Sequence, residues 1–175
     1  MHMLSWLSTS GTAAIVNFPG VLYRGGAEQK IRKYLIDNNY IDTVIQLPPD
    51  LFFGTTIATC IIVLKKSKKD NSTLFIDASA EFVREGNKNK LSEQNREKIL
   101  NAFIERKDIP HFAKLVTNQT IAENDYNIAV STYVAQKEDR EEVDIKKLNA
   151  EIEQIVARQA ELRKAIDEIV KELEG

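Results

Sequence analysis

The sequence changes character near residue 135, and this change constrains the fold more than any other feature. The last aromatic residue is Tyr133, and Gly175 is the only glycine after Gly86. Residues 136–175 hold 8 basic and 12 acidic residues, a net charge of −4, whereas the preceding part holds 16 basic and 14 acidic, a net of +2. We therefore expect a mixed α/β body followed by an acidic helical tail.

The tail has a heptad repeat of apolar residues, which is typical of a coiled-coil helix. Eight of its nine a and d positions are apolar, and the ninth, Gln159, would help to fix the register. A stripe of this length must be buried, either on the body or on a partner helix. The charged stretch at residues 137–142 resembles a spacer, which favours a partner, and self-association is also open. The nine positions are Ile145, Leu148, Ile152, Ile155, Gln159, Leu162, Ile166, Ile169 and Leu173.

The body has the pattern of alternating strands and helices. Helical spacing of apolar residues predicts a helix over residues 28–39, between two apolar runs, and such a βαβ unit has parallel strands by default. The third and fourth runs are joined by only about nine residues, so we expect them to pair antiparallel. The expected class is α/β, with one edge of a mixed, mainly parallel sheet. The four predicted strands are residues 12–17, 41–47, 57–64 and 74–77.

Further along the chain, helical and strand signals alternate again. Ser92 can cap a helix that runs to about Arg106. Residues 120–123 (TIAE) match a capping box for a short helix, and another strand is expected at residues 128–134. The residues of the first helix that are expected to face inward are Ile99, Leu100 and Phe103.

Composition excludes several classes of protein. Cys60 is the only cysteine, so a disulfide scaffold is impossible, and its place in the most apolar run predicts a buried, inert thiol. No phosphate-binding loop, zinc-ligand spacing or nucleophile elbow occurs in the sequence. The longest apolar run, residues 57–64, is too short to cross a membrane. A net charge of −2 is a poor signature for binding nucleic acid unaided.

The segment LPPDLFFGTT, residues 47–56, carries the strongest local signal in the body. Phe52 and Phe53 beside a glycine, on a loop at a sheet edge, could form a platform for a flat ligand such as a base. The alternative is an aromatic plug that closes the core. The Pro-Pro pair does not match the Asn/Asp/Ser-Pro-Pro-aromatic tetrapeptide of amino-group methyltransferases, because Leu47 and Asp50 occupy its two ends.

A basic run follows the third predicted strand, and it has two interpretations. Its lysines could contact DNA phosphates near the aromatic segment, since phosphate contacts from lysine dominate affinity for nucleic acid. The other interpretation is a solvated turn, in which the lysines have no functional partner. The residues concerned are Lys65, Lys66, Lys68 and Lys69.

These motifs together resemble a known family. The stretch from Pro19 to Lys66 closely resembles the C-terminal half of the methyltransferase domain in modification subunits of type I restriction–modification systems. These proteins are S-adenosylmethionine-dependent DNA adenine-N6 methyltransferases. The RGGAE-KIRK and LF-GT-I-TC combinations are the most specific, and LFIDAS at residues 74–79 and END-YN at residues 123–127 look like later marks of the same family. The resemblance covers most of residues 1–135.

The resemblance also implies what this sequence lacks. The glycine-rich turn that holds the methionine part of the cofactor and the Asn-Pro-Pro-aromatic tetrapeptide are absent from these 175 residues. We therefore expect a C-terminal portion of a modification subunit that binds no cofactor and is not catalytically competent alone, with S-adenosylmethionine bound in the complete enzyme. The expected divisions are the C-terminal portion of the α/β domain (1–80), a mixed helical extension (81–135) and the amphipathic helix (136–175).

Roles and partners follow from the same resemblance. Related adenine methyltransferases stack an aromatic residue on the flipped adenine, and Phe52 is the best match, with Phe53 second. In the family, the C-terminal region of the modification subunit docks on long helices of the specificity subunit, so the tail is the expected contact in a complex that also includes the restriction subunit and DNA. The expected location is the cytoplasm of a bacterium or archaeon, without membrane contact. A stand-alone adaptor that only associates through its helix is the alternative.

Overall fold

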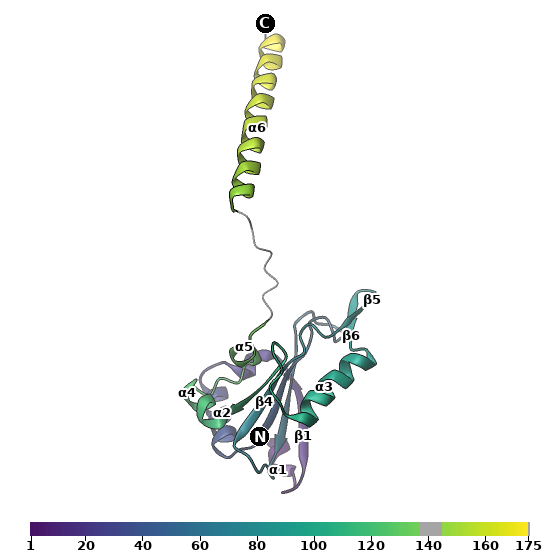
Figure 1. Ribbon diagram of the computed structural model, residues 1–175, viewed down its shortest axis with the longest axis vertical. Coiled ribbons are helices and arrows are strands. Elements are labelled where there is room, and N and C mark those ends of the chain that lie inside the picture. Colours follow the sequence, from purple (N-terminus) through teal and green to yellow (C-terminus); the bar gives the residue numbers. More distant parts are fainter. Residues whose placement is uncertain (137–144, 175) are drawn as a thin grey trace. The chain divides into compact units, whose positions relative to one another are not determined.

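The computed structural model of this chain describes residues 1–136 and 145–174. The chain divides into two units, Met1–Lys137 and Glu138–Gly175. The first unit, the body, holds a five-stranded sheet with helices on both faces (Figure 1). The second unit contains one long helix, α6 (Ile145–Glu174).

The sheet is built from β1 (Thr12–Asn17), β2 (Ile41–Gln46), β3 (Cys60–Lys65), β4 (Ser72–Asp77) and β7 (Ala113–Thr117). Their order across the sheet is β1-β3-β2-β4-β7. β2 pairs in parallel with β4, and the other three pairings are antiparallel. Strands β1, β2 and β4 therefore run in one direction, and their carboxyl ends meet at one edge of the sheet, which we call the carboxyl edge.

The strand pairing corrects the sequence prediction. β3 lies between β1 and β2, so the two strands of the expected βαβ unit run parallel but do not pair. The expected antiparallel pair of β3 and β4 is wrong because β2 lies between them, and with one parallel pairing in four the sheet is not mainly parallel. The link at residues 66–71 can extend about 20 Å, which is enough to step over one strand at about 4.8 Å from each neighbour.

Two apolar clusters hold the helices to the two faces of the sheet. The first surrounds the fully buried Phe75, whose ring centroid lies 4.4 Å from that of Tyr133. Ile99 and Phe103 pack against the second cluster as expected, but Leu100 is exposed, contrary to the prediction. The first face is covered by α2 (Ala27–Asp37), α4 (Asn118–Glu123) and α5 (Val130–Tyr133), and the second by α3 (Glu93–Glu105) (Figure 1).

The start of α3 follows the sequence prediction, whereas the next elements do not. Ser92 caps α3 by accepting a hydrogen bond from the backbone N–H of Asn95, whose side chain completes a capping box. Thr117 caps α4, so the capping box expected at residues 120–123 is wrong. The strand expected at residues 128–134 is also wrong, because β7 already occupies the edge beside β4 and these residues form α5 instead.

A small hairpin and two short helices complete the body. The hairpin strands pair antiparallel in a sheet of their own, around a turn in which Gly86 adopts a φ of 61°. A positive φ at this place favours glycine. The sequence prediction contains none of these elements, nor β7. The two short helices are α1 (His2–Trp6) and the 3-10 helix η1 (Pro19–Leu22), and the strands of the hairpin are β5 (Val83–Glu85) and β6 (Lys88–Lys90).

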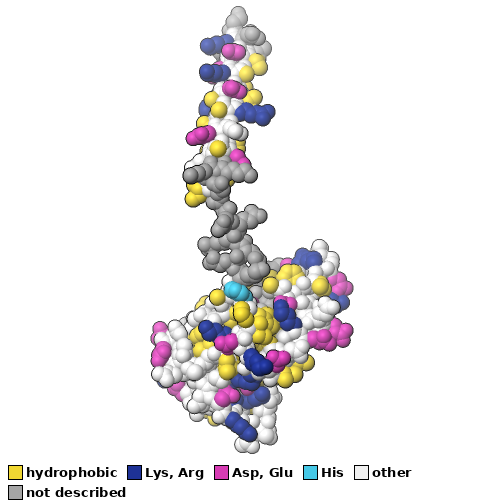
Figure 2. All heavy atoms as spheres, viewed as in Figure 1, with side chains coloured by type: hydrophobic (Ala, Val, Ile, Leu, Met, Phe, Trp, Pro, Cys, Tyr) yellow, Lys and Arg dark blue, Asp and Glu magenta, His cyan; other side chains and the backbone are white. Residues whose placement is uncertain are grey.

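Helix α6 has 30 residues, which at about 1.5 Å per residue gives a length of about 45 Å. The apolar side chains of its predicted a and d positions are exposed, from 47% at Leu148 to 69% at Ile145. Figure 2 shows hydrophobic side chains at intervals along this helix, between charged ones. The side chain of Leu173 and the spacer expected at residues 137–142 lie outside the described residues.

Candidate functional site

A long loop, residues 47–59, joins β2 to β3 at the carboxyl edge of the sheet. We call it the aromatic loop. Its two ends are tied together because the backbone N–H of Leu47 donates to the carbonyl of Thr59 at 2.8 Å. Leu47 is itself buried in the second apolar cluster. The loop is therefore anchored at the edge where ligands bind in open α/β sheets, outside the carboxyl ends of the parallel strands.

The two phenylalanines of the aromatic loop differ in exposure. Phe53 is 97% exposed, and Phe52 is 40% exposed. Gly54 follows with a φ of 77°, a left-handed conformation that turns the chain directly after Phe53. A ring that closes the core would be buried, so the alternative of an aromatic plug is wrong for Phe53.

The β5–β6 hairpin contacts the aromatic loop through side chains of both strands. Asn89 Nδ2 donates to the carbonyl of Pro49 at 2.8 Å, and the backbone N–H of Asn89 donates to the carbonyl of Asp50 at 3.1 Å. Lys88 Nζ lies 3.4 Å from Asp50 Oδ1, and Arg84 Nη1 lies 3.3 Å from Asp50 Oδ2. The carboxylate of Asp50 is thus held between two cations of the hairpin.

The structure places the predicted basic run at the other end of β3. This strand begins at Cys60 beside the aromatic loop and ends at Lys65, about 17 Å further along. Lys65 Nζ lies 3.5 Å from a carboxylate oxygen of Asp42, and Lys66 and Lys68 each donate to backbone carbonyls at 2.6 Å. Burial lowers the pKa of Lys68 to about 8. The expectation that this run lies near the aromatic loop is therefore wrong.

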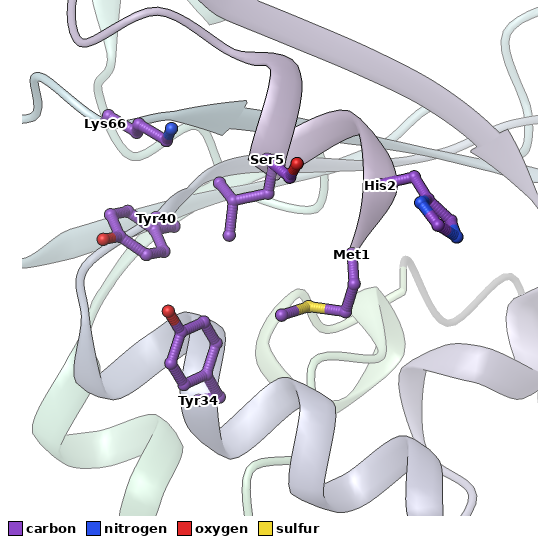
Figure 3. A pocket seen from close by; sticks show the side chains of 7 residues that line it. Met1, His2, Ser5, Tyr34, Tyr40 and Lys66 are labelled. Atoms are coloured by element: carbon purple, nitrogen blue, oxygen red, sulfur yellow. The ribbon is translucent and has the colours of Figure 1, made fainter.

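A separate hollow of about 330 Å³ lies beside α1. Figure 3 shows the rings of Tyr34 and Tyr40 and the side chain of Met1 around it. Lys66 is the only lysine or arginine among its lining residues, and its ammonium group donates to the carbonyl of Leu7. This hollow offers no convergent set of reactive groups, so we assign no chemistry to it.

The residues that the structure describes contain neither a cluster that could hold a metal ion nor a helix that could span a membrane. Nowhere in residues 1–136 and 145–174 do three histidine, cysteine or carboxylate side chains gather closely enough to hold a metal ion. None of the helices described in the structure combines the length and apolar character needed to cross a bilayer. The aromatic loop is therefore the candidate functional site of this chain.

The aromatic loop thus presents exposed aromatic rings at the carboxyl edge of an α/β sheet. The sequence profile described as N-6 DNA Methylase matches residues 1–142. The chain belongs to this family.

Relatives and solved structures agree with the profile. The Type I restriction enzyme MpnII methylase subunit of Mycoplasma pneumoniae is 49% identical over 99% of this chain and 32% of its own length. The MjaVII methylase subunit of Methanocaldococcus jannaschii is 35% identical over 92% of this chain and 28% of its own length. A crystal structure of the type I restriction-modification system methyltransferase subunit from Streptococcus thermophilus matches with a TM-score of 0.69 and 48% identity, over 71% of this chain and 26% of that one.

These matches confirm the resemblance to modification subunits of type I systems and the expected mixed α/β fold with a C-terminal helix. This chain spans about a third of the length of the curated relatives it matches. The match to the Mycoplasma pneumoniae subunit covers 174 residues, so it includes nearly all of α6 as well as the body.

Proposed function

We propose that this chain is the section of a type I DNA adenine-N6 methyltransferase that contacts the target base and a neighbouring subunit. The complete enzyme would transfer the methyl group of S-adenosylmethionine to the exocyclic amino group of adenine. The observation that carries this proposal is Phe53, 97% exposed on an anchored loop at the carboxyl edge. The family supports it, because its relatives are methylase subunits of type I restriction enzymes.

An exposed aromatic ring at this edge suits a base that has left the DNA duplex. An enzyme that modifies a base must take it out of the stack, which requires an apolar face to replace the lost stacking. Stacking on an aromatic side chain contributes about 1–3 kcal/mol per base. Phe52 is the residue that the family resemblance favours, and Phe53 is the more exposed of the two.

The open side of the sheet supports the proposal that further protein packs on this body in the complete subunit. β1 is the last strand on its side within the described residues, and an edge strand presents backbone groups that can pair with another strand. A groove of about 380 Å³ adjoins it, lined largely by apolar side chains that include Ile15, Ile31 and Leu35. We propose that the rest of the methyltransferase domain continues the sheet beyond β1.

The cofactor belongs to that other part of the complete enzyme. In a methyltransferase, a glycine-rich turn follows the strand that presents the methionine part of S-adenosylmethionine, because only glycine lets the backbone approach closely. In this chain β1 is followed by Phe18 and Pro19, which do not fit that role. We therefore place the contacts to S-adenosylmethionine, which supplies the methyl group, on residues outside this chain.

The exposed stripe of α6 supports a role in assembly. Burying an isoleucine or leucine side chain stabilises a complex by about 1.5–3 kcal/mol, and eight apolar positions along one helix face offer many such contacts. We propose that α6 packs on long helices of the specificity subunit, in a complex that also holds the restriction subunit and DNA. Contact of DNA phosphates by Lys65, Lys66, Lys68 and Lys69 stays a prediction for a separate edge of the body.

The test of the base-contact proposal is methylation by the complete methylase, assembled with its specificity subunit. We expect Phe52→Ala or Phe53→Ala to lower kcat/KM for DNA by about tenfold or more, because stacking on the flipped base is lost. Binding of S-adenosylmethionine should be unchanged in both variants. The matched control is Trp6→Ala, which removes an exposed aromatic ring from α1 and should leave methylation normal.

Normal methylation by both phenylalanine variants would reject the proposal. If the tail of those variants still bound a partner, a protein that only associates through its helix would then be the better description. A loss of methylation in Trp6→Ala equal to that in Phe53→Ala would also count against a specific role for the aromatic loop.

A further inference from the structure

The contacts of Lys88 enclose the tip of the aromatic loop. Lys88 Nζ donates to the carbonyl of Phe52 and to the carbonyl of Thr55, each at 3.2 Å. These two carbonyls lie on either side of Phe53 and Gly54 in the chain. The ammonium group of Lys88 therefore bridges the two ends of the segment that carries Phe53, while the side chain of Phe53 itself is exposed to solvent.

The base of the same loop is held from the same hairpin. Asn89 is only 6% exposed and binds the carbonyls of Pro49 and Asp50, and Arg84 Nη1 donates to Asn89 Oδ1 at 3.0 Å. Lys88 and Arg84 flank the carboxylate of Asp50, so the charges that meet at this point are of opposite sign. The loop is thus fixed at its base by Asn89 and at its tip by Lys88.

We propose that Lys88 is a positioning residue for the target base, which acts by holding the aromatic loop in the conformation that presents Phe52 and Phe53. This inference rests on the proposed function, in which those rings receive the flipped adenine. A loop without regular secondary structure would otherwise lose conformational freedom when the base binds, and that loss would weaken binding. Lys88 removes it in advance by pairing the loop carbonyls before DNA arrives.

The first experiment measures the loop itself in the full chain. We expect Lys88→Met to accelerate amide hydrogen exchange at Asp50 and Ile57 by about tenfold or more, because the contacts of Lys88 that hold the loop closed are lost. The N–H groups of these two residues donate within the loop, to the carbonyl of Thr56 at 3.4 Å and to Thr55 Oγ1 at 3.1 Å. The matched control is Lys90→Met on the same strand, since Lys90 is paired with Glu85 at 2.8 Å and has no contact with the loop among the hydrogen bonds of the described residues. Unchanged exchange in Lys88→Met would overturn the proposal.

The second experiment uses the complete methylase. Lys88→Met should lower kcat/KM for DNA by about tenfold, Lys88→Arg should recover most of it, and Lys90→Met should have no effect. In a double variant with Phe53→Ala and Phe52→Ala, adding Lys88→Met should lower kcat/KM no further, because there is no ring left to position. An equal further loss in that background would mean that Lys88 acts elsewhere and would overturn the proposal.

The two proposals fail in different ways. Normal methylation by the phenylalanine variants would remove the role of the loop, whatever the exchange data show. The other case is that the phenylalanine variants are impaired in methylation, whereas Lys88→Met has normal exchange and normal kcat/KM. This result would support the base contact and refute the positioning role of Lys88 alone.

Discussion

Phe53 and Phe75 are used in opposite ways in this fold. Phe75 is fully buried in the first apolar cluster, whereas Phe53 is almost fully exposed. We expect Phe75→Ala to lower the free energy of unfolding by about 3–5 kcal/mol, since it leaves a cavity in the core, and Phe53→Ala to change it by less than about 0.5 kcal/mol. Urea unfolding followed by circular dichroism measures both. A loss at Phe53 comparable to that at Phe75 would show that its ring has a structural role.

Cys60 is fully buried in β3, as the sequence predicts, and its surroundings make it inert. Burial raises the pKa of its thiol from 9.0 to about 11. The neutral thiol therefore contributes its full share of stability below pH 9.0 and loses it as the pH rises towards 11. We expect no measurable reaction with a disulfide reagent such as DTNB at pH 8 in the native protein, and complete reaction in denaturant. Fast labelling of the native protein at pH 8 would contradict this.

Single residues differ in how far the sequence reveals them. Phe52 and Phe53 can be identified because an aromatic pair beside a glycine, between two apolar runs, is a local pattern. Lys88 cannot be identified from the sequence, because its contact with Asp50 joins residues 38 positions apart. No sequence pattern indicates which residue a lysine in a charged stretch will contact. The Gly-Asn pair at residues 86–87 is a signal for the hairpin, but it does not say which surface the hairpin will contact.

The apolar a and d positions of helix α6 lead to a prediction about assembly with a partner. The stripe that they form should tolerate no charge once it is buried on a partner, so we expect Ile155→Glu to weaken copurification with the specificity subunit by about tenfold or more. The neighbouring Gln154→Glu adds the same charge outside the a and d positions and should leave assembly unchanged. Equal retention of the specificity subunit by both variants would contradict the assembly role. Dimers of the isolated chain that Ile155→Glu dissolves would instead indicate self-association.

The apolar sequence patterns predict where the strands lie in the chain but not how they pair. The apolar runs locate β1 to β4 to within a few residues; most residues of β2, β3 and β4 are buried, whereas those of β1 are exposed or half-buried. These runs do not give the strand order, since pairing depends on which strand fits at the centre, and five of the six residues of β2 are buried. β7 has an irregular burial pattern, with only Ala113 and Val116 buried, so its sequence does not predict a strand.

For the whole molecule, both the net charge and the length of the chain are consistent with a section of a larger DNA-modifying subunit. The net charge of −2 combines a slightly positive body with an acidic tail, so a poor overall electrostatic signature for DNA is no argument against a DNA-modifying parent. The chain matches 32% and 28% of the lengths of the two relatives described above, which is consistent with the proposal that the cofactor site lies elsewhere in the complete subunit.

That division makes a prediction for the isolated chain. We expect calorimetric titration with S-adenosylmethionine to give no binding signal, because no glycine-rich turn follows β1 to receive the methionine part. The complete methylase, titrated under the same conditions, is the control and should bind. Micromolar binding by the isolated chain would contradict the proposed placement of the cofactor.

The central claim is that the aromatic loop receives the target base, and photocrosslinking measures this contact directly. DNA with 5-iodouracil in place of the target adenine is irradiated in complex with the complete methylase, and the attached peptide is identified by mass spectrometry. A base stacked on an aromatic ring should crosslink to it. We predict attachment at Phe52 or Phe53, lost when both are changed to alanine. Efficient attachment to a residue outside the aromatic loop, unaffected by those substitutions, would contradict the claim.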